Sequence, residues 1–458
     1  MWDVREAAEV LEAKLLRPMA PFTASGAGCD SRRIRPGDVF VAIRGRVRNG
    51  QEFLPEAYAR GAVGALVAED RGVGHNLILV SDPVQALWDL AAWRRGMLDI
   101  SVVGVTGSFG KTTTKELVAA ALSTRYRTYR PPENYNTEIG VPLSVLSIPD
   151  DAELAVFELG MTARGEIRKL AELVQPWAGI ITAVGPAHLG ALGSLEQIAE
   201  AKWELADTLP EEGLLVLGWD SPELRARVER CAGLCLRFGN TEEADFFPQH
   251  IVADDPTGVR FQAVGPGGGA TVKLQLLGEH VAVLACGALA LAWGMGIPEK
   301  SAAQALTHVP PVSHRLNLVQ APFGWVLDDC YNANPLSMGV ALRTLRALRV
   351  PVARRVALLA DMLDLGPDEE RYHREAVEQA RALGVDALFC YGPRFARAFG
   401  SWGGPGAAEE DDLEGLLSLL HSELWPGPCL LLVKGSRAMA LERAVDYLLR
   451  SPNSVPPS

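Results

Sequence analysis

The feature that most constrains this chain is a glycine-containing loop between a strand-like run and a helix-like run, at residues 104–116. The first N–H groups of a helix have no intrahelical partner, so such a junction can surround phosphate oxygens. The Lys111 ammonium adds positive charge, and the Thr112 hydroxyl can reach a metal ion. The strict pattern would place glycine at 105, where this chain has Val105. The loop is therefore a variant of the phosphate-binding pattern.

Length and composition predict a chain of several globular domains. The 458 residues exceed what one hydrophobic core usually organises, and we expect three domains. Apolar residues make up 48% and charged residues 22%, which supplies enough apolar surface for a large buried core. The expected boundaries are 1–97, 98–312 and 313–458.

The order of apolar runs predicts an α/β fold with a central P-loop-type parallel sheet. Strand-like runs end at Val105, Glu158 and Val184, and each is followed by a helix-compatible segment. Residues 214–276 are richer in short strands and predict an antiparallel annex with a hairpin connection at 265–269. The flanking regions predict a small N-terminal α/β domain and a Rossmann-like C-terminal domain.

Charge and cysteine content exclude several classes of protein. The 44 basic and 56 acidic residues give a net charge of −12, which disfavours binding to nucleic acid through bulk charge. The seven cysteines contain no paired C-x-x-C motif, so neither a disulfide framework nor a structural zinc site is indicated. The charged N-terminus lacks a signal-peptide pattern, and no apolar run is long enough to span a membrane. We expect a cytoplasmic protein.

Polar residues at the predicted strand ends are the candidates for chemistry, because ligands gather at that edge of an α/β sheet. Glu158 ends an apolar strand and could bind Mg²⁺ beside the phosphates. His188 lies just beyond another strand, although a lone histidine is more often a satisfied loop residue. Asp328 ends a third strand, and Arg315 at the predicted domain junction could reach phosphate charge across a cleft or remain on the surface.

The helix predicted to begin at Ser194 carries Lys202. Ser194 and Gln197 have the spacing of a capping box and predict that a helix begins there. By composition alone, Lys202 within this helix is a solvated lysine.

Motifs across nearly the whole chain resemble those of the ATP-dependent Mur ligases of peptidoglycan synthesis. The Tyr-Asn-Ala-Asn-Pro block at 331–335 resembles most closely the branch that adds D-alanyl-D-alanine. The matching motifs are Asp-Ser-Arg at 30–32, Pro-Gly-Asp-Val-Phe-Val-Ala at 36–42, the loop at 106–113, Asn-Tyr-Asn-Thr-Glu-Ile-Gly-Val-Pro at 134–142, Glu-Leu-Gly at 158–160, His188, Ala-Lys at 201–202, the block at 328–338, Asp-Met-Leu-Asp-Leu-Gly at 361–366 and Lys-Gly-Ser-Arg at 434–437.

The resemblance implies a ligase that joins D-alanyl-D-alanine to UDP-N-acetylmuramoyl-tripeptide through an acyl phosphate and releases ADP. This step would belong to cytoplasmic precursor synthesis for cell wall biogenesis, cell shape, the cell cycle and cell division. The implied cofactors are ATP and Mg²⁺, with a carbamate on Lys202 that would replace an ammonium repelling the metal. We expect a monomer that binds neither nucleic acid nor membrane.

The resemblance also implies roles for individual residues. The implied catalytic residues are Lys111, Glu158, His188, Lys202 and Arg315. The implied ATP-binding residues are Thr106, Gly107, Ser108, Phe109, Gly110, Lys111, Thr112, Thr113, Arg315 and Asp328. The implied metal ligands are Thr112, Glu158, His188 and Lys202. The implied substrate-binding residues are Asp30, Ser31, Arg32, Asn134, Asn136, Thr137, Glu138, Asn332 and Asn334.

The chain departs from the family pattern where the adenine base is expected. The family's Gly-x-His-Asn-x-x-Asn reads Gly-Glu-His-Val-Ala-Val-Leu at 278–284, so Val281 and Leu284 replace two asparagines. Three alternatives therefore stay open: a related acid:amino-acid ligase with another acceptor, a catalytically silent protein that binds nucleotide or UDP-sugar, and a simple P-loop kinase or GTPase.

Overall fold

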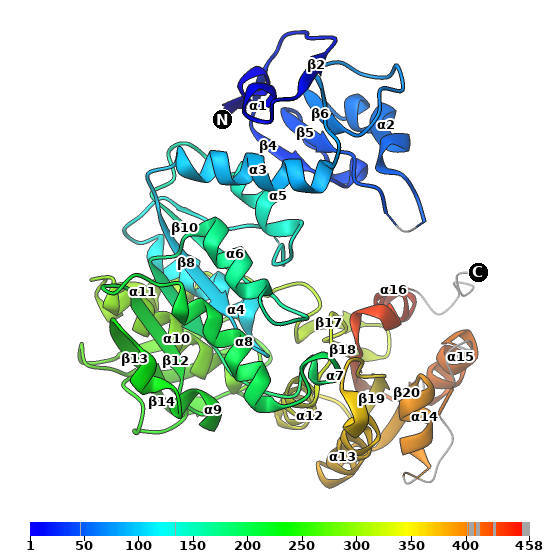
Figure 1. Cartoon of the computed structure of the whole chain (residues 1–458). Coiled ribbons are helices and arrows are strands. Elements are labelled where there is room, and N and C mark those ends of the chain that lie inside the picture. Colours follow the sequence, from blue (N-terminus) through cyan, green and yellow to red (C-terminus); the bar gives the residue numbers. More distant parts are fainter. Residues whose placement is uncertain are drawn as a thin grey trace.

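Three α/β units follow one another along the chain, each built on its own sheet (Figure 1). The computed structural model describes residues 1–45, 47–132, 134–400, 402, 407–408, 413–424 and 427–450. The N-terminal unit is drawn in blue, the central unit in cyan to light green, and the C-terminal unit in yellow to red.

The N-terminal unit has a five-stranded sheet in the order β2-β7-β6-β5-β4, in which only the β2–β7 pair is antiparallel. A two-stranded pair, β1 with β3, lies beside it. The elements are β1 (Trp2–Asp3), α1 (Val4–Val10), β2 (Lys14–Leu16), β3 (Thr23–Ala24), β4 (Gly26–Gly28), β5 (Asp38–Val41), α2 (Leu54–Ala59), β6 (Gly64–Val67), β7 (Leu77–Leu79) and α3 (Pro83–Gly96).

The central unit has a six-stranded parallel sheet in the order β13-β12-β11-β8-β10-β9. Its elements are β8 (Ser101–Thr106), α4 (Lys111–Leu122), β9 (Thr128–Tyr129), α5 (Gly140–Leu146), β10 (Leu154–Glu158), α6 (Glu166–Val174), β11 (Ala178–Ile181), α7 (Leu189–Leu192), α8 (Leu195–Asp207), β12 (Leu214–Gly218), α9 (Pro222–Arg225), β13 (Leu234–Phe238), α10 (His280–Gly294) and α11 (Glu299–Leu306). The predicted parallel sheet is confirmed, although β11 ends at Ile181 and not at Val184.

The predicted antiparallel annex of the central unit is also confirmed. It is a three-stranded sheet of β14 (Phe247–Val252), β15 (Val259–Val264) and β16 (Ala270–Leu274), with residues 265–269 connecting the last two strands as a hairpin. Its apolar side chains share a core with α4, α10 and one face of the six-stranded sheet. The annex therefore covers apolar surface that would otherwise face solvent.

The C-terminal unit has a six-stranded sheet in the order β17-β18-β22-β19-β20-β21. The β17–β18 pair is an antiparallel hairpin that the sequence did not predict, whereas the other neighbours are parallel. The elements are β17 (Asn317–Ala321), β18 (Gly324–Asp328), α12 (Pro335–Ala347), β19 (Arg354–Ala360), α13 (Glu369–Ala382), β20 (Ala387–Tyr391), α14 (Pro393–Phe399), β21 (Ala407–Ala408), α15 (Leu413–Leu424), β22 (Cys429–Lys434) and α16 (Glu442–Leu449).

Helix α3 joins the first two units through a continuous core. Its Leu87 and Leu90 belong to one apolar cluster with Val39 and Ile78 of the N-terminal sheet and with Phe157 of β10. The N-terminal sheet is therefore anchored on the central unit by buried apolar contacts as well as by the connecting chain.

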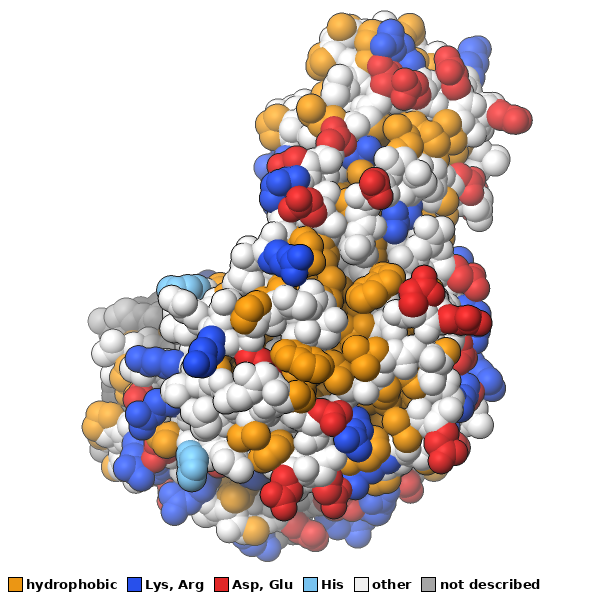
Figure 2. Space-filling model, turned by 90° about the vertical axis from the view of Figure 1, so that its left-hand side faces the viewer, with side chains coloured by type: hydrophobic (Ala, Val, Ile, Leu, Met, Phe, Trp, Pro, Cys, Tyr) orange, Lys and Arg blue, Asp and Glu red, His pale blue; other side chains and the backbone are white. Residues whose placement is uncertain are grey.

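The surface carries both signs of charge. Figure 2 shows acidic and basic side chains interspersed over the described part of one face, without an extended basic stripe of the kind that nucleic-acid-binding surfaces use. No helix in the described part of the chain combines the length and the apolar character that a membrane crossing requires.

Candidate active site

The loop between β8 and α4 has the geometry of a phosphate-binding turn. Helix α4 begins at Lys111 after Gly110, which has a left-handed φ of 77°, and within the described residues no side chain caps this helix end. At Gly107, a Cβ atom would lie 1.9 Å from Oγ1 of Thr182, so only glycine fits there. The free N–H groups and the macrodipole of α4 favour an anion at this position.

The Lys111 ammonium is held inside the same loop. Its Nζ donates a hydrogen bond to the carbonyl of Gly107 at 2.8 Å. Burial lowers the pKa of Lys111, while the nearby Glu158 carboxylate opposes that shift. The charge is thus placed in a partly water-excluded site, where its attraction for phosphate is stronger than in bulk water.

Thr112 and Glu158 place oxygen donors beside the phosphate loop. The Thr112 hydroxyl donates to Oε2 of Glu158 at 2.6 Å, and the Asn136 amide donates to Oε1 at 2.6 Å. Both Thr112 and Glu158 are 2% exposed. A hydroxyl and a carboxylate are the hard ligands that Mg²⁺ prefers.

Lys202 and His188 both lie close enough to Lys111 for its charge to affect them. Lys202 is 2% exposed, and within the described part of the chain we find no hydrogen bond or ion pair of its ammonium. Burial and then the Lys111 charge hold the pKa of Lys202 well below its usual value. The expectation of a solvated lysine, drawn from composition alone, is therefore wrong, because α8 turns this position toward the core. The Ser194 side chain caps α8 through Gln197, as the spacing predicted.

His188 reaches the site from a strained position. It precedes α7 with a left-handed φ of 60°, and its Nδ1 lies 4.0 Å from the Asp364 carboxylate of the C-terminal unit. Burial, then Lys111 and Lys202, lower the pKa of His188. A neutral imidazole, the form that ligates metals, is thereby favoured.

The C-terminal unit completes the site with two polar contacts. Nη2 of Arg315 donates to Oγ1 of Thr112 at 2.9 Å, and Nδ2 of Asn334 donates to the carbonyl of Ser108 at 3.0 Å. The Arg315 guanidinium also lies 4.5 Å from the centroid of the Tyr331 ring, which orients it. The central and C-terminal units thus contact each other at the phosphate loop.

The phosphate loop borders a cavity of about 450 Å³, which we call the phosphate-loop cavity. Fifteen of the predicted site residues line it: Ser108, Phe109, Gly110, Lys111, Thr112, Thr113, Asn134, Asn136, Thr137, Glu138, Glu158, His188, Arg315, Asn332 and Asn334. The predicted residues outside this lining are Thr106, Gly107, Lys202, Asp328 and the three residues at 30–32.

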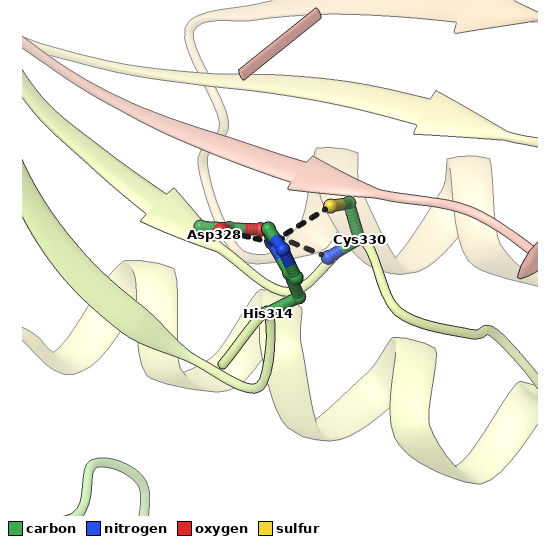
Figure 3. Close-up of side chains that lie close together, drawn as sticks. All are labelled: His314, Asp328 and Cys330. Atoms are coloured by element: carbon green, nitrogen blue, oxygen red, sulfur yellow. Dashed lines mark hydrogen bonds and ion pairs between the residues drawn. The ribbon is translucent and has the colours of Figure 1, made fainter. Parts of the chain in front are cut away.

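At the end of β18 the two aspartates point in different directions. Asp329 lines the phosphate-loop cavity and accepts a 2.6 Å hydrogen bond from Nζ of Lys434. Asp328 is not among the residues that line the cavity, and its Oδ2 accepts a hydrogen bond from Nδ1 of His314 at 2.7 Å (Figure 3).

A second cavity, of about 870 Å³, lies between the N-terminal and central units, and we call it the junction cavity. Asp30, Arg33 and Arg35 line it from the N-terminal unit. Ser31 does not line it and donates to Oε2 of Glu56 at 2.6 Å, while Arg32 pairs with Asp30 on the surface. Of the predicted residues at 30–32, only Asp30 faces this cavity.

Among the residues on the wall of the phosphate-loop cavity that sequence reasoning missed, two make a polar contact with each other or with the 134–138 segment. Trp88 of α3 and Lys169 of α6 both line the cavity, with Nζ of Lys169 4.3 Å from the centroid of the Trp88 ring. Nε1 of Trp88 also donates to the carbonyl of Glu138 at 2.8 Å and so holds the 134–138 segment. Both are ordinary helix residues, and no sequence signal marked them.

The comparisons with known proteins agree with this architecture. Residues 105–292 match the Mur ligase middle domain, and residues 314–437 match the Mur ligase glutamate ligase domain. A UDP-N-acetylmuramoyl-tripeptide--D-alanyl-D-alanine ligase from Bacillus subtilis is 34% identical over 98% of this chain and 99% of its own length.

Solved structures of Mur ligases also resemble this chain over nearly its whole length. The crystal structure of MurF from Acinetobacter baumannii has a TM-score of 0.83 and 28% identity, covering 98% of this chain and 99% of the other. MurF from Thermotoga maritima in complex with ADP has a TM-score of 0.77 and 27% identity, covering 94% and 98%. The three-unit fold and the phosphate-loop site define an ATP-dependent, amide-bond-forming ligase. The chain belongs to the Mur ligase family.

Proposed function

We propose that this chain joins D-alanyl-D-alanine to UDP-N-acetylmuramoyl-tripeptide with conversion of ATP to ADP and phosphate. The relatives that carry this name match the chain over nearly its whole length, including the Bacillus subtilis ligase. The observation in the structure that carries the proposal is a phosphate loop contacted from the C-terminal unit by Arg315 and Asn334. That arrangement suits a reaction in which phosphoryl transfer must be shielded from water.

The two cavities suggest where the muramoyl substrate lies. Asn134 and Asn136 line the phosphate-loop cavity, whereas Tyr135 between them lines the junction cavity. The 134–138 segment is therefore a shared wall. In our proposal the UDP end occupies the junction cavity near Asp30, and the tripeptide carboxylate reaches the phosphate-loop cavity past Thr137 and Glu138.

The proposed chemistry has two steps. A terminal carboxylate oxygen attacks the γ-phosphorus of ATP, the bond to the β-phosphate oxygen breaks, and ADP leaves. The amine of D-alanyl-D-alanine then attacks the acyl carbon, phosphate leaves, and one proton is released. Lys111 and Arg315 would stabilise the charge spread over the transferring phosphoryl group, which is the main catalytic requirement of such a step.

The residues present fit a Mg²⁺ ion at this place. Thr112 and Glu158 offer oxygen atoms 2.6 Å apart at the base of the loop, and His188 offers a ring whose neutral form is favoured. We propose that Thr112 and Glu158 hold one Mg²⁺, that His188 belongs to a second, and that a carbamate on Lys202 organises the metal site. When bound, Mg²⁺ supplies positive charge to the phosphate oxygens.

Lys202 fits the proposed carbamate. Its buried amine has a lowered pKa, and carbamylation needs the neutral amine, which adds to the carbon of CO₂ with loss of one proton. The product would turn a buried group that repels Mg²⁺ into an anionic oxygen ligand.

We further propose that each of the three units has its own binding function. Residues 1–97 would bind the UDP-sugar, residues 98–312 would bind ATP, and residues 313–458 would close over the nucleotide. We place the protein in the cytoplasm as a monomer, where nucleotide-linked precursors are made.

To test the proposed ligase activity, ADP release by the purified protein is measured with Mg-ATP, first with both UDP-N-acetylmuramoyl-tripeptide and D-alanyl-D-alanine and then with each of them omitted. We expect release to require both UDP-N-acetylmuramoyl-tripeptide and D-alanyl-D-alanine, with UDP-N-acetylmuramoyl-pentapeptide identified by mass. The assay should vary the third residue of the tripeptide among lysine, diaminopimelate and ornithine. ATP binding without ADP release on any tripeptide would contradict the proposal.

A further inference from the structure

Three potential metal ligands meet at the start of the C-terminal unit, outside the phosphate-loop cavity. His314, Asp328 and Cys330 each offer one donor atom, and these atoms all lie within 4.8 Å of one another (Figure 3). Nδ1 of His314 lies 2.7 Å from Oδ2 of Asp328 and 3.5 Å from Sγ of Cys330. None of the three residues lines the phosphate-loop cavity.

The arrangement is not that of a nucleophilic cysteine triad. In a triad, one ring nitrogen of histidine faces the nucleophile and the other faces the carboxylate. Here the same Nδ1 atom faces both the thiol and the carboxylate. The Cys330 N–H and the Cys330 thiol also face the Asp328 carboxylate, so the three donor atoms all point toward one another, and one metal ion between them would contact all three.

The spacing of the donor atoms is close to that of a tetrahedral metal site. With metal–nitrogen and metal–oxygen bonds near 2.1 Å and a metal–sulfur bond near 2.3 Å, tetrahedral geometry puts ligand atoms roughly 3.3–3.6 Å apart. The sulfur-to-nitrogen separation of 3.5 Å already falls in this range. The hydrogen-bonded nitrogen and oxygen, now 2.7 Å apart, need to separate by roughly 0.7 Å, which a small side-chain rotation supplies.

The surroundings leave one side of the cluster open. Asp328 and Cys330 are 4% and 1% exposed, but the His314 side chain is 34% exposed. A metal ion can therefore enter past His314, and water can occupy its fourth position. Burial raises the pKa of the Cys330 thiol, so its coordination displaces one proton to solvent.

We propose that His314, Asp328 and Cys330 bind one divalent transition-metal ion, with Zn²⁺ as the best match. A nitrogen, oxygen and sulfur donor set suits borderline ions and does not suit Mg²⁺, which takes oxygen ligands. This site is separate from the Thr112 and Glu158 oxygens at the phosphate loop.

Metal binding here fixes the segment that carries Arg315. His314 and Leu316 flank Arg315, and both have left-handed φ angles, 58° and 51°. The Tyr331 N–H donates to the carbonyl of His314 at 3.2 Å, next to the ring on which Arg315 lies. The ion therefore ties the interdomain segment to the end of β18, one residue from the guanidinium that contacts Thr112.

The test titrates the metal-free full-length protein with Co²⁺ in saturating Mg²⁺ and records the absorption spectrum. Co²⁺ bound to cysteine gives a sulfur-to-cobalt charge-transfer band, which oxygen and nitrogen ligands at the phosphate loop do not produce. We expect one equivalent of Co²⁺ to give this band and Cys330→Ser to abolish it. His314→Asn, which suits the left-handed backbone at this position, should weaken Co²⁺ binding by at least about tenfold.

The control is the double variant Cys231→Ser with Cys235→Ser, because these two thiols also lie in contact and could bind a soft metal. It should keep the band at wild-type strength. The proposal is overturned by a wild-type protein without the band, by a band that survives Cys330→Ser, or by a band lost in the double variant. Since the readout is spectroscopic, it is independent of the ligase reaction.

Discussion

Arg315 is the residue whose loss should separate phosphoryl transfer from nucleotide binding. It comes from the C-terminal unit and donates to Thr112 at 2.9 Å across the interface, 203 residues away in sequence. If a phosphoryl oxygen replaced the Thr112 hydroxyl as the hydrogen-bond acceptor of Arg315, it would lie at a similar distance from Nη2 of Arg315. We therefore predict that Arg315→Ala impairs the step in which phosphoryl charge spreads.

The magnitude follows from the distance. A guanidinium whose charge is centred about 4 Å from one unit of phosphoryl charge contributes about 4 kcal/mol at an effective dielectric constant of about 20. Since about 1.4 kcal/mol corresponds to a tenfold change in rate, Arg315→Ala should lower kcat by about 10³-fold if the contact forms mainly in the transition state. The KM for ATP should change much less, because Lys111 and the loop amides remain.

The assay is steady-state ADP release with all three substrates at saturation. Arg315→Lys keeps a point charge but loses the planar fork and the stacking on Tyr331, so its kcat should fall between those of the wild type and the alanine variant. Thermal unfolding of each variant controls for folding. A kcat for Arg315→Ala within about tenfold of the wild type would refute the reasoning, because removal of a contributing charge costs more than that.

Three further predictions concern the same region. Lys111→Ala should abolish ADP release while Lys300→Ala, at an exposed helix lysine, leaves it unchanged; turnover near the wild-type value in Lys111→Ala would contradict the assigned role. Lys202→Ala should be poorly active and partly rescued by small carboxylates in the same assay, whereas a fully active alanine variant would mean that no carbamate is needed. Burial lowers the pKa of His280 to about 3, and Nδ1 of His280 has no hydrogen-bond partner in the described part of the chain. Below about pH 6.5 His280 is therefore protonated in the unfolded chain but stays neutral in the folded protein, so the free energy of unfolding falls as the pH falls toward 3. Between pH 7.5 and pH 5 His280 alone should lower the free energy of unfolding of the wild type by about 2 kcal/mol. Denaturant unfolding at both pH values should show that loss in the wild type and in His308→Asn, at an exposed histidine, but not in His280→Leu; equal losses in all three proteins would rule out the linkage.

Much of the fold follows from local patterns. The strand, loop and helix around Lys111 could be predicted because a glycine turn between an apolar run and a helix former has few alternative structures. The Ser194 cap and the hairpin at residues 265–269 depend on neighbouring residues only, and the structure contains both. The antiparallel β17–β18 pair was missed because β17 is a half-buried edge strand with a weak apolar signal.

The sequence by itself determined the alternation of strands and helices, the phosphate loop and the family to which the chain is similar, because these depend on residue order and short-range geometry. Only the tertiary structure decided which side chains meet. Lys202 is buried because α8 packs against the central sheet, and Asp329 faces the phosphate-loop cavity while Asp328 faces His314. Arg315 reaches Thr112 because two separately folded units dock. Such contacts join residues far apart in the chain, so their formation depends on packing between units and leaves no local pattern in the sequence.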